Sequence, residues 1–496
     1  MSVASHSLHP TAEPIGGSPD TMVGGSFAAA PLVRLMAARQ KLASTPLSLR
    51  SGRLVRVKGL ILEVEGLALA LGQHALISTG QMQAVEAVCI SFDHAVTQLM
   101  PLDADAVVSP GATVYPADTP ADLGGRYAML ERPPSLPLGE GLLGRIVDGF
   151  GRPLDSLGVQ IDEVPGVAPS AVNPLHRVPI QRPMDVGVRA VNGLLSVGRG
   201  QRLGIFAGTG VGKSVLLGML ARHCEADVVV IGLIGERGRE VREFLEDVLG
   251  AERLRQSVMV VATADTVPLA RVRGAIFATE VATWFRDRGR HVLLIMDSLT
   301  RYAMACREIA LGLGEPPVSR GYPPSVFQRL PELVERAGNG ADPAGSLTAF
   351  YTVLLESDDS ADPVADAIRG VLDGHVVLSR ALAEMGHYPA IDLERSISRS
   401  MHKVTDAAHR RAAMLVKRLF GRYMRSRELV ALGAYTAGSD AELDAALAFW
   451  PALSAYLQQG PGERAGWDQC LAQLLALTGQ TGQGGLNGRT AAAATA

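Results

Sequence analysis

A glycine-rich segment near the middle of the chain has the residue types of a phosphate-binding loop. AGTGVGKS follows an apolar run and leads into the helical pattern VLLGMLARHC. Glycines let successive backbone N–H groups converge on one anion, and the helix directs its positive end there. A lysine then adds a cation for the β- and γ-phosphates, and a serine adds a hydroxyl for Mg²⁺. Although alanine stands where this pattern usually begins with glycine, the segment predicts a nucleotide site made of Ala207, Gly208, Thr209, Gly210, Val211, Gly212, Lys213, Ser214 and Val215.

Two carboxylates follow other apolar runs and are candidates for the remaining chemistry. Asp297 comes directly after HVLLIM and is expected to hold Mg²⁺; a cap on the helix that begins near Leu299 is the structural alternative, and both roles can hold together. Glu236 ends the run DVVVIGLIG and is a candidate for orienting the water that attacks the phosphate. A salt bridge to Arg237 or Arg239, or a cap on the next helix, explains Glu236 equally well.

The elements that must position these residues form an α/β domain. Between about residues 136 and 391, apolar runs alternate with amphipathic helical patterns, which predicts a parallel sheet buried on both faces. Short β-rich runs before this region predict a small barrel, and the chain is helical after Arg399. One continuous helix is expected over 237–249. The expected units are a flexible N-terminal segment (1–46), a barrel (47–128), a nucleotide-binding domain (129–394), a helical domain (395–477) and a disordered tail (478–496).

Composition excludes several classes of protein. The 496 residues include 47 Lys plus Arg and 50 Asp plus Glu, a net charge of 47 − 50 = −3, which gives no overall field for nucleic acid. The four cysteines form no CxxC pair, and no secretory signal or membrane span is visible. We therefore expect a cytoplasmic protein that does not bind nucleic acid.

Three further segments have both a functional and a structural interpretation. The helical pattern Pro31–Leu42 suits a partner or lipid headgroups, or else caps its own domain. The acidic residues Asp358, Asp359 and Asp362 suggest a second metal site or a solvated turn. A basic stretch after residue 409 is expected to be a solvated helical face; it comprises Arg410, Arg411, Lys417, Arg418, Arg422, Arg425 and Arg427.

Five segments together resemble one known family. AGTGVGKS, GLIGERGRE, LLIMDSLTRYAMACREI, GYPPSVFQRLPELVERAG and GHYPAIDLERSISR resemble the family that contains the catalytic subunits of rotary ATP synthases and the ATPases of type III secretion. The stretch from NPLHRVPIQRP to GMLAR is most similar to the flagellar export branch. The resemblance runs from about Gly52 into the helical C-terminal region. It implies a RecA-like P-loop core with a small N-terminal β-barrel and a C-terminal helical domain.

The resemblance also implies roles for individual residues. Glu236 matches the glutamate that activates water, and Arg237 and Arg301 match arginines around the γ-phosphate and its acidic network. Tyr388 matches a tyrosine that packs on adenine, although a half-buried core aromatic explains it without the family. Arg399 matches an arginine that reaches the γ-phosphate held by a neighbouring subunit. A glutamate and such an arginine on one chain imply a closed ring of identical subunits, six in this family.

The implied activity is Mg²⁺-dependent hydrolysis of ATP that energises chaperone release and protein export through the flagellar apparatus. Expected partners are a regulatory protein at the N-terminal helix, a central stalk in a pore lined by residues 312–324 and touched by the acidic loop, chaperone–substrate complexes and a membrane-embedded export gate. The protein would then lie at the inner face of the cytoplasmic membrane. Alternatives are the same enzyme in a virulence-type secretion system, a non-catalytic ring subunit, which Glu236 disfavours, and an RNA helicase, which the near-neutral charge disfavours.

Overall fold

The computed structural model describes residue 36 and residues 50–79, 84–93, 96–117, 137–157, 173–341, 345–355 and 362–479. The expected partner-binding helix Pro31–Leu42, apart from Met36, lies outside these residues, as do Asp358 and Asp359. The expected tail also lies outside them, apart from its first two residues, 478 and 479. In the described part of the chain no helix is both long enough and apolar enough to cross a membrane.

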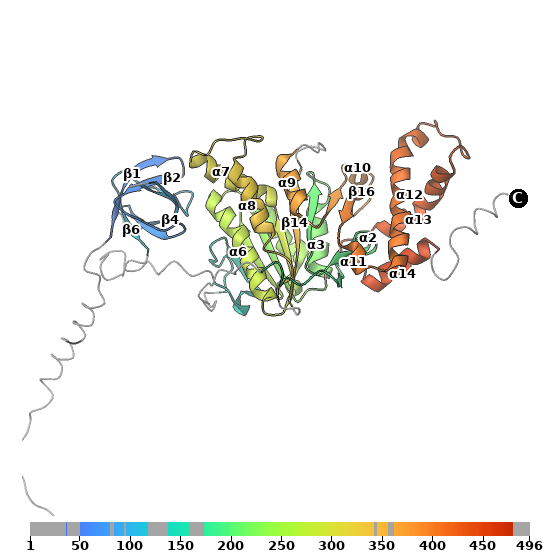
Figure 1. Ribbon diagram of the computed structural model, residues 1–496, viewed down its shortest axis with the longest axis horizontal. Coiled ribbons are helices and arrows are strands. Elements are labelled where there is room, and N and C mark those ends of the chain that lie inside the picture. The colour runs from blue at the N-terminus through green and yellow to red at the C-terminus, as the bar shows by residue number, and fades with distance from the viewer. Residues whose placement is uncertain are drawn as a thin grey trace, which may run out of the picture.

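The first unit is a closed six-stranded antiparallel barrel (Figure 1). Alternating side chains fill its interior, which is how a small barrel buries a core. Ile61, Val88 and Met100 belong instead to the apolar cluster of the following domain, so the barrel packs against that domain. The strands are β1 (Gly52–Lys58), β2 (Ile61–Glu65), β3 (His74–Ser78), β4 (Ala84–Asp93), β5 (Val96–Pro101) and β6 (Thr113–Pro116).

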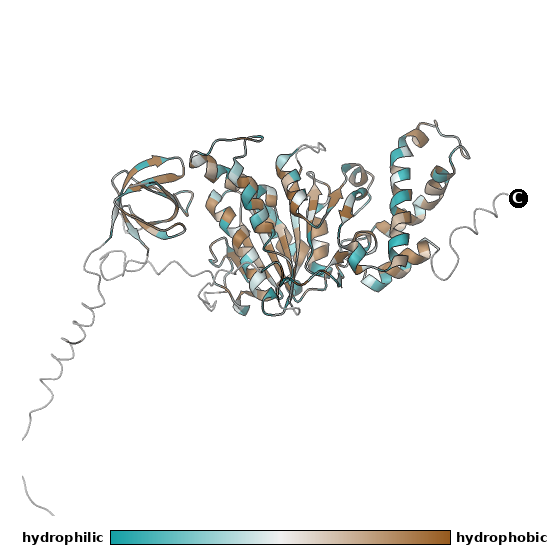
Figure 2. Ribbon diagram, viewed as in Figure 1, coloured by the Kyte–Doolittle hydropathy of each residue, from teal (hydrophilic) through white to brown (hydrophobic). Residues whose placement is uncertain are grey.

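The second unit is built on an eight-stranded sheet in the order β16-β15-β10-β14-β13-β11-β12-β7, parallel except for β16. Its strands are largely apolar (Figure 2), as expected for strands covered on both faces. β8 (Pro183–Met184) and β9 (Val197–Gly198) form a separate pair. The sheet strands are β7 (Ile146–Asp148), β10 (Arg202–Ala207), β11 (Val228–Ile234), β12 (Ser257–Ala262), β13 (His291–Asp297), β14 (Ser346–Leu354), β15 (Gly374–Leu378) and β16 (Ile391–Ser398).

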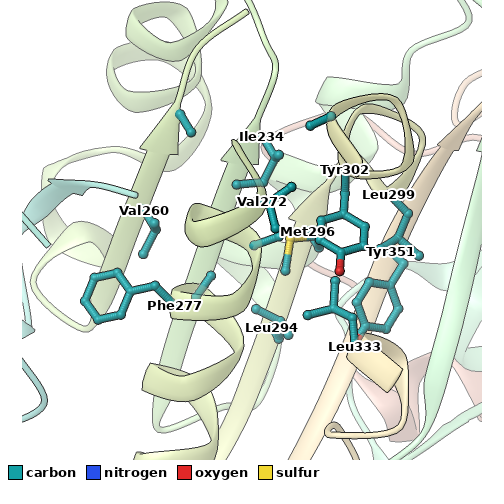
Figure 3. Close-up of a cluster of buried hydrophobic side chains, with 14 of the residues drawn as sticks. Ile234, Val260, Val272, Phe277, Leu294, Met296, Leu299, Tyr302, Leu333 and Tyr351 are labelled. Atoms are coloured by element: carbon teal, nitrogen blue, oxygen red, sulfur yellow. The ribbon is translucent and has the colours of Figure 1, made fainter. Parts of the chain in front are cut away.

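Side chains of β13 alternate between two buried clusters, as the period of two in a strand requires. Leu294 and Met296 join the cluster under the helix that carries Phe277 (Figure 3), whereas Leu293 and Ile295 face the opposite layer. Burying one such side chain stabilises the fold by about 1.5–3 kcal/mol. The helices of this unit are η1 (Glu140–Leu142), α2 (Arg189–Leu194), α3 (Lys213–His223), α4 (Gly238–Glu243), η2 (Phe244–Leu249), α5 (Ala251–Leu254), α6 (Pro268–Arg286), α7 (Leu299–Gly312), α8 (Pro324–Val334), α9 (Pro363–Val371) and α10 (Arg380–Glu384).

The C-terminal unit is helical and packs on α2 through buried polar contacts. Arg189 donates to the carbonyls of Tyr456 and Gln458, and His409 contacts the carbonyl of Gly193. The expected basic face is partly paired, since Arg418 and Arg422 form ion pairs with acidic residues of the next helix and its cap. The helices are α11 (Met401–Val404), α12 (Ala407–Ala431), α13 (Ala441–Leu457) and α14 (Trp467–Leu477).

The architecture expected from the sequence is confirmed, with two local differences. The strand β16 continues to Ser398, beyond the limit of 394 expected for the nucleotide-binding domain. The helix expected over 237–249 is regular only to Glu243, because the backbone then widens into a π-helix in which Gly250 N–H bonds to the carbonyl of Leu245. Such widenings occur frequently at functional sites.

Candidate functional site

The predicted phosphate loop lies at the carboxyl end of β10, between that strand and α3. Ala207 is the last residue of the strand, and Lys213 is the first of the helix. Gly210 and Gly212 have φ angles of 78° and 88°, a region in which glycine avoids the steric cost of a Cβ. The loop therefore places backbone N–H groups at a helix N-terminus, which is the arrangement that binds phosphate.

Lys213, Glu236 and Asp297 converge beside this loop. The lysine Nζ lies 2.5 Å from Asp297 Oδ1 and 3.3 Å from Glu236 Oε1. Asp297 ends β13, and Glu236 follows the adjacent parallel strand β11, so both carboxylates leave the same edge of the sheet. Because ligands bind at this edge in open α/β sheets, the three side chains form the candidate catalytic cluster.

The cap of α7 excludes one of the two roles considered for Asp297, the capping role. Ser298, not Asp297, is the N-cap residue, and its hydroxyl accepts a hydrogen bond from the N–H of Arg301. Asp297 instead accepts from the Thr352 hydroxyl at 2.5 Å, and its carboxylate is almost entirely buried. The carboxylate is therefore free of a capping role and is fixed toward the loop.

Burial and the neighbouring charges together raise the pKa values of both Glu236 and Lys213. Burial, followed by the charge of Asp297, raises the pKa of Glu236 to about 7, and the opposing effect of Lys213 is smaller. Burial also works against the charge on Lys213, but Asp297 and Glu236 outweigh it and raise the lysine pKa. Glu236 therefore changes protonation near neutral pH, whereas Lys213 stays charged.

We expect kcat/KM for the predicted ATP hydrolysis to fall as the pH drops below about 7, because this ratio reports the pKa of the essential base in the free enzyme and Glu236 is the predicted base. Protonated Glu236 cannot accept a proton from water, so the fall should approach tenfold per pH unit. The measurement is a rate profile from about pH 5.5 to 9 at constant ionic strength. A kcat/KM that stays constant across this range would contradict the role of Glu236.

A cavity of about 260 Å³ opens between the loop helix and the π-helical segment. Its wall includes the Ser214 hydroxyl and five carboxylates, and hydroxyl and carboxylate oxygens are the ligands that Mg²⁺ prefers. Nowhere in the described residues are three His, Cys, Asp or Glu side chains arranged to enclose a metal ion. A cation here would need oxygens from substrate phosphates, which is how Mg²⁺ is usually bound. The lining residues are Ser214, Val215, Leu233, Glu236, Glu240, Glu243, Phe244, Asp247, Val248 and Asp297.

Of the other residues expected at the site, one lies beside the phosphate loop and two lie near Glu236. The ring of Tyr388 lies against Gly212, where an added Cβ would be 3.3 Å from the ring. Arg301 packs its stem against Gly235, and its buried Nε has no hydrogen-bond partner. Arg237 is mostly exposed, with its Nε 4.0 Å from Glu240 Oε1.

Arg399 lies at the opposite end of the sheet from the loop. It follows β16, and its N–H donates to the carbonyl of Asp373. The N–H of Asp373 in turn donates to the carbonyl of Arg202, the first residue of β10. The five steps along the strand from Leu203 to Gly208 span about 16 Å at roughly 3.3 Å per residue. This exceeds the length of an arginine side chain, so Arg399 cannot reach the phosphate loop of its own chain.

Two residues near the site were not found from the sequence. Thr352 is fully buried in β14 and donates to Asp297; its only signal is a hydroxyl within an apolar strand. Arg380 begins α10, and its Nη2 lies 3.7 Å from the position that a Cβ on Gly208 would take. Arg380 follows β15 and is 172 residues from Gly208 in the sequence, so no local pattern indicates that it lies near the loop.

Two segments with other expected roles have a local structural function where they are described. Asp362 caps α9, since its carboxylate accepts from the N–H groups of Val364 and Ala365. The loop before α8 closes through a bridge between Ser319 and Tyr322, with Arg320 at φ 45°. The Asp362 contacts favour the turn interpretation for that residue.

The fold and the site are those of a P-loop ATPase. Residues 187–398 match the nucleotide-binding domain of the ATP synthase alpha/beta family, and residues 405–476 match the T3SS EscN ATPase C-terminal domain. The flagellum-specific ATP synthase of Salmonella typhimurium is 53% identical over 438 residues, which cover 88% of this chain and 95% of that protein. The chain belongs to the family of flagellum-specific ATP synthases and type III secretion ATPases, and it is an ATP-hydrolysing enzyme of type III export.

Other comparisons agree with this assignment. The type 3 secretion system ATPase of Xanthomonas euvesicatoria is 43% identical and covers 88% of this chain and 96% of its own. The assembled ATPase EscN of the enteropathogenic E. coli type III secretion system is 40% identical with a TM-score of 0.77, covering 86% of this chain and 99% of that one. The expected family is therefore confirmed.

Proposed function

We propose that this chain hydrolyses Mg²⁺-ATP in sites completed by a neighbouring copy, and that hydrolysis energises export through the flagellar apparatus. The observation that carries the proposal is the convergence of Lys213, Glu236 and Asp297 beside a phosphate loop. A non-catalytic nucleotide-binding subunit would bind nucleotide without needing a carboxylate at the position of Glu236.

Binding of ATP would reorganise the pairs within the cluster. The Lys213 ammonium now lies between two carboxylates, and the β- and γ-phosphates would compete for it as they enter the loop. Ser214 and Asp297 would hold Mg²⁺, which supplies positive charge to the β- and γ-oxygens. Because the cavity wall is acidic, free ATP would be repelled more strongly than Mg²⁺-ATP.

Glu236, released from Lys213, would orient the attacking water. Its partial burial keeps the carboxylate poorly solvated, so it is a stronger base than an exposed glutamate. Arg237 and Arg301 would contact the γ-phosphate and the acidic network, and the unpartnered Nε of Arg301 supports this for Arg301. Tyr388, half exposed beside Gly212, would pack on adenine.

Arg399 would complete the site of the next subunit. Its position at the far end of β10 excludes action within its own chain, and a closed head-to-tail ring would bring this end to a neighbour's loop. EscN was solved as an assembled ATPase and also in complex with its central stalk EscO, and the latter structure is 39% identical to this chain with a TM-score of 0.75. We propose a hexameric ring with a stalk protein in its pore.

The remaining partners extend this proposal. A regulatory protein would bind the Pro31–Leu42 helix, and chaperone–substrate complexes and a membrane-embedded export gate would contact the ring at the inner face of the cytoplasmic membrane. The flagellar role is favoured over a virulence role because identity is 53% to the Salmonella flagellar protein and 43% to the Xanthomonas secretion ATPase.

Phosphate release across a range of protein concentrations, with and without Mg²⁺, tests the proposal. We expect specific activity to rise with concentration as rings form, and to disappear when EDTA removes Mg²⁺. The control is ATP binding measured in the same dilute samples, which should persist because the loop belongs to a single chain. Equal specific activity at all concentrations would contradict the shared site, and activity in EDTA would contradict the metal.

A further inference from the structure

A fully buried glutamine, Gln201, lies where the sheet begins. Its Oε1 accepts from the N–H of Gly198 at 2.9 Å, and its Nε2 donates to the carbonyl of Asp373 and to the Ser398 hydroxyl, both at 3.0 Å. The amide thus has partners at both ends, as buried polar groups require. Two of these partners, Asp373 and Ser398, belong to the segments that hold Arg399.

The backbone of Arg399 depends on the same contacts. Its N–H donates to the Asp373 carbonyl at 2.9 Å, the carbonyl that Gln201 also binds, and Ser398 is the preceding residue. The Asp373 carboxylate accepts from Arg202, and the Ser398 hydroxyl donates to the Ser196 carbonyl. Gln201 therefore joins both supports of the Arg399 backbone to the start of β10.

The Arg399 side chain has no support of its own. It is exposed, and it forms no hydrogen bond or ion pair with any residue that the structure describes. The direction in which the guanidinium leaves the protein therefore depends on its backbone. A small shift there is costly, because misplacing a reacting group by about 1 Å can reduce the rate about 10²-fold.

We propose that Gln201 is a positioning residue that fixes Arg399 for the neighbouring site, an inference that rests on the proposed role of Arg399 in that site. The strand after Gln201 pairs with β14 on one side and β15 on the other, and it ends at the phosphate loop. The strand β10 thus connects the phosphate loop of one site to Gln201 and, through it, to the arginine of the next site. A displacement of the phosphate loop can therefore be transmitted along β10 to Arg399.

The test is Gln201→Met, which keeps an unbranched side chain of similar length but removes all three hydrogen bonds. We expect kcat to fall about ten- to hundredfold while KM for ATP changes less than about twofold, since the phosphate loop is intact. In an Arg399→Ala background the same substitution should produce no further fall, because the residue that it positions is gone. Ser398→Ala removes one of the three Gln201 bonds together with the bond from the Ser398 hydroxyl to the Ser196 carbonyl, and it should show a fall with the same dependence on Arg399.

The matched control is Asn192→Leu, which removes another buried amide, one that accepts from the N–H of Val186 and donates to the Asp185 carboxylate and the Ala465 carbonyl. If Asn192→Leu lowers kcat, the fold-loss in the double variant with Arg399→Ala should equal the product of the two single losses. The proposal would be overturned by a kcat near wild type in Gln201→Met, or by a further fall in the double variant like that of the control. Wild-type turnover in Arg399→Ala alone would instead overturn the proposed function.

Discussion

Replacing Glu236 with glutamine is expected to reduce ATP hydrolysis by at least about 10²-fold while ATP binding is retained. The amide has nearly the same shape as the carboxylate but cannot take a proton from water, and general-base catalysis contributes about 10²–10⁴-fold. Binding depends on the loop and on Lys213, which would lose one of its two carboxylate partners. Equilibrium binding of fluorescent ATP and steady-state phosphate release measure the two effects separately.

The control for this variant is Glu246→Gln. Glu246 is a nearby exposed carboxylate that pairs with Arg242 at 2.8 Å and is not part of the cavity wall. Surface ion pairs of this kind contribute little, so its turnover should match wild type. Turnover near wild type in Glu236→Gln would show that another group prepares the water.

Replacing Arg399 with alanine is expected to reduce kcat by about 10³-fold or more, the range measured when an arginine finger is absent. The folded subunit should be unaffected, because the side chain is exposed and has no partner among the described residues. ATP affinity should also be kept, since the loop lies at the other end of β10. Single-turnover phosphate release separates this loss from any change in binding.

The control for this variant is Arg411→Ala, which removes an exposed arginine of α12, a helix of the C-terminal unit. It should leave kcat unchanged. A kcat for Arg399→Ala within about threefold of wild type would exclude a finger role, whatever the oligomeric state.

Much of the site could be predicted from the sequence because its parts are locally encoded. The phosphate loop carries its own strand, glycines and helix, so Lys213 and Ser214 could be identified by spacing alone. Glu236 and Asp297 each follow an apolar run, which fixes them at the carboxyl edge of a parallel sheet. The strands themselves appeared as continuous apolar runs because both faces are covered.

The contacts that could not be predicted depend on strand order, which the spacing of residues does not determine. β14 lies between β10 and β13, and only this order lets Thr352 donate to Asp297. β15 lies on the other side of β10, which brings Arg380 to Gly208. The π-helix after Glu243 was also missed, because its side chains have ordinary helical spacing in the sequence.

Mixing the Glu236→Gln and Arg399→Ala proteins before assembly tests the central claim most directly. Each variant alone should be nearly inactive, but a mixed ring contains sites where an intact Glu236 faces an intact Arg399 from its neighbour. At equal proportions about one quarter of the sites are complete, so we expect the rate to rise well above either parent, toward about one quarter of wild type. A mixture no more active than its two components, despite mixed rings, would contradict a site shared between subunits.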